Sequence, residues 1–473
     1  MNKSVNLPKL FVILSLFIGT LLVMLVPPFN APDEETHFMY SYEISEGSFL
    51  PKVENEEAGH YIPSAVFASI EENKKLVNDR EAKYSYNEMY YDNLLSSEYK
   101  NKGFMKLNVQ TKPIIAYLAP AVGVEVATHL EAFSDGKKVS TEVLLQFARF
   151  FSLLAYTIIG YFAIKITPKF KKSFFAILLL PMSVFLRSVV SYDGFILVIS
   201  ALALANILKL IDTKNIKFTK RHFILFVITG FVLLNVKTVY SIIFLGLLAV
   251  PNEAFGTKKN KVKKYVQIGA LILAISFVRR LFYSGLPSSS NELFGEQINY
   301  IISHPFNYFK ILVHNVLSQM KIQSWWLFGT YGCLDTYVPM LFEFLLKLYL
   351  VIVIIMDIFH EKIKISKWIK IGYFVCTILS VFAMYSYMYI YWTTLVTNEV
   401  GGNFITGVQG RYYIPLLLLF PIIFNNNLID KIKNEKVRKL GEKIYNIYDN
   451  NFHYFTIFSL VFAVIIIVLR FYV

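Results

Sequence analysis

The sequence has little cysteine and few charged residues for its length. Only 17% of its 473 residues are charged, against about 25% in an average soluble protein. Two cysteines do not make a disulfide framework, and only Cys376 lies within an apolar run, so we expect it not to pair with Cys333. The hydrophobic content of 55% excludes a disordered chain.

Sequence motifs for nucleotide or metal chemistry are also absent. The chain has no Walker P-loop, no GxGxxG after a strand, no HExxH and no paired Cys/His pattern. A reaction driven by a cytoplasmic nucleotide is therefore unsupported, and we predict no nucleotide cofactor. The formal charge of +14 does not indicate a nucleic-acid partner, because the lysines form short clusters between apolar runs, as in an oriented membrane protein.

Long apolar runs dominate the chain and predict an all-α polytopic membrane protein. The run at 223–250 is too long for one helix of about 20 residues, so we interpret it as two helices with Asn235 and Lys237 at the tip between them. The runs then predict a bundle of about eleven transmembrane helices. They are 10–26, 143–164, 173–190, 193–208, 223–250, 265–282, 337–356, 368–391, 412–424 and 454–473.

Basic clusters set the expected orientation. The run at 10–26 has no convincing cleavage site after it, which favours an uncleaved first helix over a signal peptide. With eleven spans and a cytoplasmic N-terminus, every basic cluster falls on the cytoplasmic side. These clusters begin at Lys165, Lys209, Lys258, Lys362 and Lys431.

The expected organisation has five parts along the chain. A first transmembrane helix at 1–26 is followed by a large extracytoplasmic loop at 27–142 and by helices 2–7 at 143–283. A second extracytoplasmic loop at 284–336 contains an amphipathic helix at 305–320, which we expect to lie in the interface. Helices 8–11 then occupy 337–473.

Acidic residues directly after the first span are the strongest functional signal. The segment Pro32-Asp33-Glu34-Glu35-Thr36-His37-Phe38 lies next to the membrane in this topology. Ionisable residues near the bilayer are costly and often mark function. Asp33 and Glu34 are therefore candidate catalytic carboxylates, with His37 one helical turn from Asp33. Capping of a helix that starts at Asp33 explains the same residues about equally well.

Cationic residues gather at the same outer end. Arg187 and Asp193 flank a helix junction, where an ordinary Arg–Asp pair or a snorkelling arginine competes with phosphate binding. Lys237 lies at an outer tip, against the positive-inside trend. In Gly407-Val408-Gln409-Gly410-Arg411-Tyr412, Arg411 lies at the N-terminus of a predicted helix. The helix dipole disfavours a cation at that end, which indicates an anionic ligand.

An outer-face carboxylate with several cations suits sugar transfer from a lipid-phosphate carrier. Asp33 or Glu34 would take the proton of the acceptor hydroxyl as a general base. The departing lipid phosphate needs positive charge, which Lys237, Arg187 or Arg411 would supply. Direct displacement with a single base implies inversion at the sugar carbon.

These landmarks resemble the bacterial membrane-protein family catalogued as domain-of-unknown-function family 2142, which is grouped with the GT-C glycosyltransferases. Its Asp-Glu-x-x-His-Phe pattern at Asp33 is also similar to that of protein O-mannosyltransferases, and Arg149 matches the family. The resemblance implies a GT-C-like bundle and a catalytic acid at Asp33 or Glu34. It also implies a polyprenyl-phosphate-sugar donor.

We therefore predict an inverting glycosyltransferase in a bacterial cell membrane, with its active site on the extracytoplasmic face. Its partners would be the lipid-linked donor, an envelope glycan acceptor such as a wall polysaccharide or teichoic acid, and the bilayer. The predicted donor-phosphate ligands are Lys237, Arg411, Arg187 and Arg149, supported by His37, Asp193, Gln409 and Tyr412. A divalent metal at Asp33, Glu34 and His37 is compatible with the residues but not required by them.

Two alternatives stay open. One is a polysaccharide polymerase or ligase of the same fold. The other is a secondary transporter or flippase of an envelope glycolipid, which would be expected to carry repeated halves and polar residues near the bilayer midplane. The sequence shows neither of these features, because its ionisable residues cluster at the outer ends of the predicted spans.

Overall fold

The fold is mostly helical, as predicted. The computed structural model describes residues 5–86, 102–106, 112–131, 140–213, 216–284, 292–425 and 434–473. Within these ranges, six helices are long and apolar enough to cross a membrane. They are Leu7–Leu25, Thr141–Ile166, Tyr192–Asp212, Lys258–Tyr283, Lys367–Thr397 and Glu435–Phe471.

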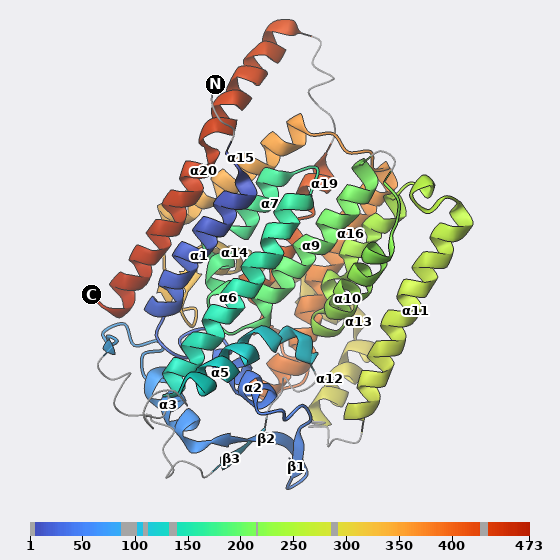
Figure 1. The fold of residues 1–473 in the computed structure, drawn as a ribbon. Coiled ribbons are helices and arrows are strands. Elements are labelled where there is room, and N and C mark those ends of the chain that lie inside the picture. Colours follow the sequence, from blue (N-terminus) through green and yellow to red (C-terminus); the bar gives the residue numbers. More distant parts are fainter. Residues whose placement is uncertain are drawn as a thin grey trace.

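The long helices lie side by side in one bundle (Figure 1). They are α1 (Leu7–Leu25), α6 (Thr141–Ile166), α9 (Tyr192–Asp212), α11 (Lys258–Tyr283), α15 (Met340–His360), α16 (Lys367–Tyr387) and α20 (Glu435–Phe471). The most apolar stretch of α9 is 89% buried, whereas that of α11 is only 6% buried. Helix α9 therefore lies at the centre of the bundle, and α11 exposes an apolar surface of the kind that lipid covers.

Two of the expected spans are broken, and a proline lies near each break. The run at 173–190 forms α7 (Lys171–Leu178) and α8 (Pro181–Arg187), and Pro181 starts the second piece. The run at 412–424 is three short pieces instead of one helix: η6 (Gly410–Tyr413), α18 (Ile414–Leu417) and α19 (Phe420–Phe424). Pro415 and Pro421 disfavour a continuous helix there.

The run at 223–250 divides as predicted. Helix α10 (Lys220–Val236) ends at Lys237, whose backbone is extended, and the 3₁₀ helix η3 (Thr238–Ala249) follows. Helix α10 and η3 pack against each other, so Lys237 lies at the turn between two antiparallel segments. Its position at the tip of a hairpin is therefore confirmed.

The first loop forms a layer at one end of the bundle. Figure 1 places it at the bottom, opposite the N-terminus and the start of α20. It contains α2 (Glu34–Ser45), α3 (Ser64–Lys74), η2 (Ile114–Ala116) and α5 (Leu118–Glu131). It also contains a small antiparallel sheet of β1 (Lys52–Glu54), β2 (Glu57–Pro63) and β3 (Lys102–Lys106), which the all-α prediction missed.

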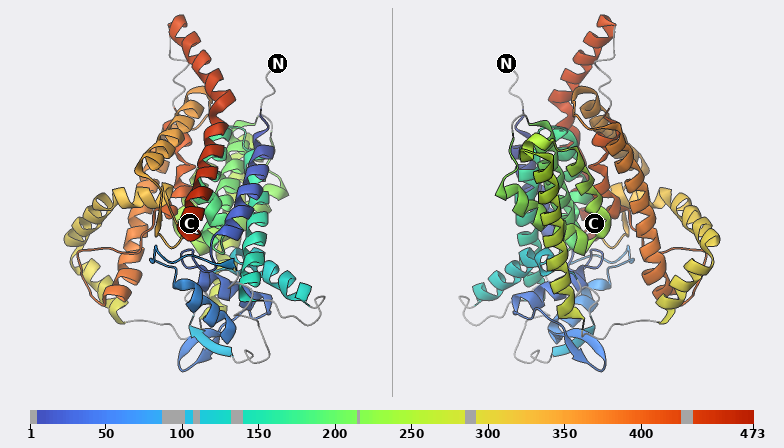
Figure 2. Two further views of the ribbon diagram at one scale, coloured as in Figure 1. Left: turned by 90° about the vertical axis from the view of Figure 1, so that its left-hand side faces the viewer. Right: turned by 90° about the vertical axis from the view of Figure 1, so that its right-hand side faces the viewer.

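The second loop is also helical. It consists of α12 (Glu292–Ser303), α13 (Pro305–Ser318) and α14 (Met320–Phe328), followed by the hairpin β4 (Thr330–Tyr331) and β5 (Thr336–Tyr337). The predicted amphipathic helix is confirmed as α13. In the side views, α12 and α13 project from the bundle (Figure 2), whereas α14 packs against η6 and so reaches the segment that carries Arg411.

Candidate functional site

Asp33 lies in a strained turn between α1 and α2. Its φ is 62°, a left-handed conformation that few residues other than glycine adopt and that Asp and Asn tolerate best. The Asn30 side-chain amide holds this turn by donating to the carbonyls of Pro28 and Asn73, at 2.9 and 3.0 Å. Asp33 occupies the N-cap position of α2, but its carboxylate makes no capping hydrogen bond. Helix capping therefore does not account for the Asp33 side chain.

The Asp33 carboxylate instead joins a chain of four charges, which we call the charge chain: Asp33, Arg411, Asp193 and Lys237. Arg411 Nη2 donates to Asp33 Oδ2 at 3.0 Å, and Arg411 Nε donates to Asp193 Oδ2 at 2.8 Å. Lys237 Nζ donates to Asp193 Oδ1 at 2.7 Å. The Asp33 side chain is 55% exposed, whereas that of Arg411 is 4% exposed. Asp33 is therefore the end of the chain that solvent or a substrate can reach.

The charge chain retains unused donors. Arg411 Nη1 is buried without a hydrogen-bond partner among the described residues. Arg411 also lines a small cavity with Pro32, Leu186 and Trp326, with room for about one water molecule. An orphaned guanidinium donor is costly in a buried site. It is a group that an anionic ligand would satisfy.

Aromatic rings enclose the charge chain. The Lys237 ammonium lies 3.5 Å from the centroid of the Tyr412 ring and 5.2 Å from that of Tyr192. Such contacts stabilise the cation at a desolvated position. Tyr412 is held in turn, because Tyr240 Oη donates to its carbonyl at 2.7 Å. Tyr412 therefore contacts the Lys237 ammonium with its ring, and its supporting role stays a prediction.

His37 lies beside the same rings. Its Nδ1 is 3.0 Å from Tyr117 Oη, and its ring centroid is 4.8 Å from that of Tyr192. Burial lowers the pKa of His37 to about 4, against the opposing effect of the Asp33 and Asp193 carboxylates. His37 is therefore neutral at physiological pH and adds no charge to the charge chain.

Glu34 has a different environment from its neighbour Asp33. It is fully buried, and Arg149 donates to both of its oxygens, Nε to Oε1 at 2.8 Å and Nη2 to Oε2 at 2.5 Å. The Val190 amide also donates to Oε1 at 2.9 Å. The remaining donors of Arg149 bind the carbonyls of Val23, Val26 and Pro27 at the end of α1. This pair joins α1, α2, α6 and the segment after α8.

Arg187 is not part of the charge chain. It is fully buried at the end of α8, where it donates to the carbonyls of Ser183 and Leu178 and to Ser15 Oγ. Its guanidinium lies 5.0 Å from the centroid of the Phe11 ring. The structure therefore brings Asp33, Asp193, Lys237 and Arg411 together, and it leaves Glu34, Arg149 and Arg187 in separate buried contacts.

A row of amide side chains positions the segment before Arg411. Asn315 accepts from the Ile405 amide at 2.9 Å, Gln319 donates to the Ile405 carbonyl at 2.7 Å, and Gln323 donates to the Val408 carbonyl at 2.9 Å. Gly410 then approaches α14 so closely that a Cβ there would lie 2.0 Å from the Gln323 carbonyl oxygen. The predicted Gln409 precedes this contact, and its Oε1 is buried without a partner among the described residues.

Sequence reasoning missed this positioning row and one nearby cation. A four-residue spacing of amides at Asn315, Gln319 and Gln323 was the available signal. The nearby cation is Lys112, which lies just before η2 in the first loop and belongs to none of the basic clusters and motifs described above. Its ammonium donates to the Val236 carbonyl at 2.9 Å and lies 5.9 Å from the Tyr192 ring centroid, so it lies beside Lys237.

The residues suggested for a metal ion do not fit one in this arrangement. Both oxygens of Glu34 bind Arg149, and His37 Nδ1 faces Tyr117. Across the described ranges, no group of three His, Cys, Asp or Glu side chains is placed to hold a metal ion.

The apolar helices and the cluster of charges at one end of their bundle define a multi-helix membrane protein. A family model described as "Predicted membrane protein (DUF2142)" matches residues 16–420, more than four fifths of the chain. The chain belongs to this family, and the charge chain and the Glu34–Arg149 pair lie wholly within the matched residues. No curated protein and no solved structure matches the chain.

Proposed function

We propose that this protein is an inverting membrane glycosyltransferase of the GT-C type. It would move a sugar from a polyprenyl-phosphate-linked donor to an envelope glycan outside the cytoplasm. The observation that carries the proposal is the charge chain, in which a half-exposed carboxylate is held next to buried cations with donors to spare. This is the arrangement that displacement of a lipid phosphate by a hydroxyl requires.

Asp33 is the general base in this proposal. Its Oδ2 is fixed by Arg411, and Oδ1 makes no hydrogen bond to another described residue. Oδ1 would accept the proton of the acceptor hydroxyl as the hydroxyl oxygen attacks the anomeric carbon. The strained backbone and the ion pair with Arg411 hold the carboxylate in one orientation, which lowers the entropic cost of the attack.

Lys237 and Arg411 stabilise the leaving group. The bond between the anomeric carbon and the phosphate oxygen breaks, and the oxygen leaves with the electron pair. Lys237 has two ammonium protons beyond the one that Asp193 accepts, and Arg411 has the free Nη1. Cations placed where negative charge develops lower the barrier. Asp193 would keep both cations in place before the donor binds.

Three of the residues predicted from sequence take structural roles in this proposal. Glu34 and Arg149 saturate each other in the interior, so neither is available for catalysis or for phosphate binding. Arg187 satisfies the carbonyls at the break between α7 and α8. The base is therefore Asp33, and the phosphate ligands are Lys237 and Arg411.

Comparison of envelope glycans tests the function. Cells lacking the protein would be compared with cells carrying wild type or Asp33→Asn, by sugar composition and linkage analysis. We expect one substituent to be missing in the null and in Asp33→Asn cells and present with wild type. Full restoration by Asp33→Asn would contradict the proposal and favour a transporter or flippase, because a flippase would need no base at Asp33.

The proposed orientation places the layer of α2, α3 and the sheet outside the cell, with eleven spans and the N-terminus inside. The start of α11 lies at the opposite end of the bundle (Figure 1). In a variant with serine at both native cysteines, Lys259→Cys should resist an impermeant thiol reagent in intact cells, whereas Lys75→Cys should react. The reverse pattern would overturn the orientation.

A further inference from the structure

A cavity of about 570 Å³ lies at the end of α9 and α10 that is remote from the charge chain. Tyr192, at the start of α9, contacts Lys237, and Val236, at the end of α10, contacts Lys112. The cavity lies at the other end of this helix pair, where α9 ends and α10 begins. Its lining consists of Asn206, Lys209, Thr219, Lys220, Arg221, His222 and Leu225. The proposed catalytic function does not use this cavity.

The charged residues of the lining are all basic. They are Lys209, Lys220 and Arg221, of which Lys220 points away from the cavity, and no carboxylate is among the lining residues. A second hollow of about 510 Å³ lies beside the segment that leads into α10 and adds Lys217, Lys263 and Lys264. A local excess of this size attracts an anion, especially where apolar helices reduce the dielectric screening.

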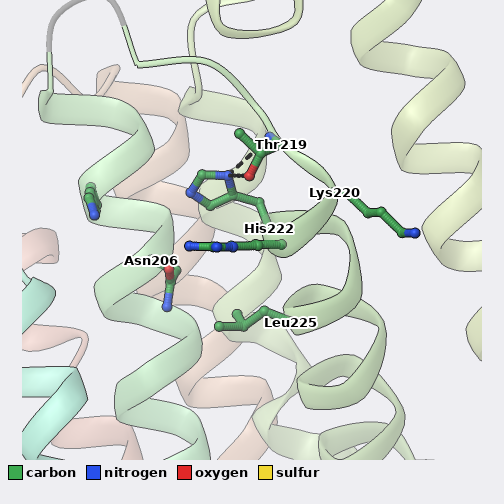
Figure 3. A pocket seen from close by; sticks show the side chains of 7 residues that line it. Asn206, Thr219, Lys220, His222 and Leu225 are labelled. Atoms are coloured by element: carbon green, nitrogen blue, oxygen red, sulfur yellow. Dashed lines mark hydrogen bonds between the residues drawn. The ribbon is translucent and has the colours of Figure 1, made fainter.

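The cavity also has uncharged polar groups. Asn206 is 6% exposed in the largely apolar α9, and its Nδ2 donates to the Leu202 carbonyl at 2.9 Å. His222 Nδ1 faces Thr219, with 2.9 Å to its hydroxyl, which leaves Nε2 for another partner. Figure 3 shows His222 and Asn206 on opposite sides of the cavity, Leu225 one turn deeper, and Lys220 directed away toward a neighbouring helix.

We propose that this cavity binds a phosphate group, with an anionic phospholipid headgroup as its source. Lys209 and Arg221 would contact the phosphate oxygens as charged donors. The first turn of α10 contributes the amides of Lys220 and Arg221 at the positive end of the helix dipole, whereas Thr219 caps the His222 amide. Leu225 lies below, at the level where the glycerol and acyl chains would continue along the helices. Basic pockets between helices at such a boundary suit anionic lipids.

Native mass spectrometry of the full chain in detergent tests the site. The probes are phosphatidylglycerol, phosphatidylcholine and soluble glycerol 3-phosphate. We expect phosphatidylglycerol to be retained at low concentration and phosphatidylcholine to be lost. If glycerol 3-phosphate displaces the lipid at similar concentration, the phosphate site stands and its ligand is soluble. Failure of glycerol 3-phosphate to compete identifies the lipid as the source. Equal retention of the two lipids would overturn the proposal.

Matched variants separate this site from general surface charge. Lys209→Gln/Arg221→Gln should weaken phosphatidylglycerol binding by at least about tenfold, since each basic residue near an anionic headgroup contributes about fivefold. Lys258→Gln/Lys259→Gln removes the same charge from exposed positions on α11 and should change binding by less than about twofold. Leu225→Trp fills the cavity with all charges kept and should also weaken binding. Equal losses in the two double variants would contradict a specific site.

Discussion

Asp33 and Glu34 are adjacent in sequence, yet the fold gives their carboxylates opposite environments. Glu34 is fully buried, and every partner it has is a protein donor in fixed geometry. Asp33 is half-exposed, keeps one oxygen unbound and connects to cations that retain free donors. A saturated buried pair fixes a structure, whereas an unsaturated and accessible pair is available for a ligand. In the proposed function, this contrast gives Glu34 a role in stability and Asp33 a role in chemistry.

The largest expected effect on stability comes from Glu34→Gln. The change leaves the buried Arg149 guanidinium without its counter-charge, which typically costs about 3–5 kcal/mol of unfolding free energy. Thermal unfolding of purified protein in detergent measures the loss. The double variant Glu34→Gln/Arg149→Gln should lose less than the sum of its single variants, because the two residues interact directly. If the stability loss of the double variant equals the sum of the two single losses, the Glu34–Arg149 pair does not stabilise the fold in the way proposed.

A smaller effect, on substrate binding, is expected from Lys237→Met. It removes charge-assisted hydrogen bonds to the donor phosphate, each worth about 1.5–3 kcal/mol. The KM for the lipid-linked donor should therefore rise by roughly tenfold or more, with little change in the KM for the acceptor. Lys83→Met is the matched control, since Lys83 donates to the carbonyls of Leu469 and Arg470 and lies outside the charge chain. Equal rises in both KM values would exclude a phosphate contact at Lys237.

The last expected effect is a dependence of the unfolding free energy on pH, caused by His37. Its folded pKa of about 4 lies below the ordinary value of 6.5, so between these values the unfolded chain binds more protons than the folded one. Stability should thus fall as pH decreases from 6.5 toward 4, by at most about 1.4 kcal/mol per pH unit. His37→Asn should flatten this part of the stability profile measured by thermal unfolding. An unchanged slope would show that another group causes it.

The sequence predicted the helical bundle well because long apolar runs and prolines are local signals. The break at Lys237 and helix α13 were confirmed for this reason. The single helix expected at 412–424 was wrong, since Pro415 and Pro421 interrupt it. The small sheet of the first loop was missed. Its β1 and β2 form a local hairpin, but β3 joins them only through pairs that are distant in the sequence, such as His60 with Met105.

The candidate site was predicted only in part, because pairing between distant residues cannot be read from one sequence. Asp33 and Arg411 are 378 positions apart, and only the fold brings them into contact. Arg149 and Arg187 were predicted as phosphate ligands because they are cations. In the structure both are buried, and they donate to Glu34 and to the Leu178 carbonyl instead. The amide row at Asn315, Gln319 and Gln323 was missed because a four-residue spacing of amides does not show which segment they bind.

The central claim is that Asp33 performs chemistry while Glu34 supports the fold. Thermal unfolding and envelope-glycan analysis of Asp33→Asn and Glu34→Gln, measured side by side, test it directly. Asn keeps the shape of Asp33 and tolerates its left-handed backbone, so the account predicts near-normal stability for Asp33→Asn. It also predicts a loss of product of roughly 100- to 10,000-fold, the range of a general base. Normal product from Asp33→Asn protein that folds normally would contradict the account.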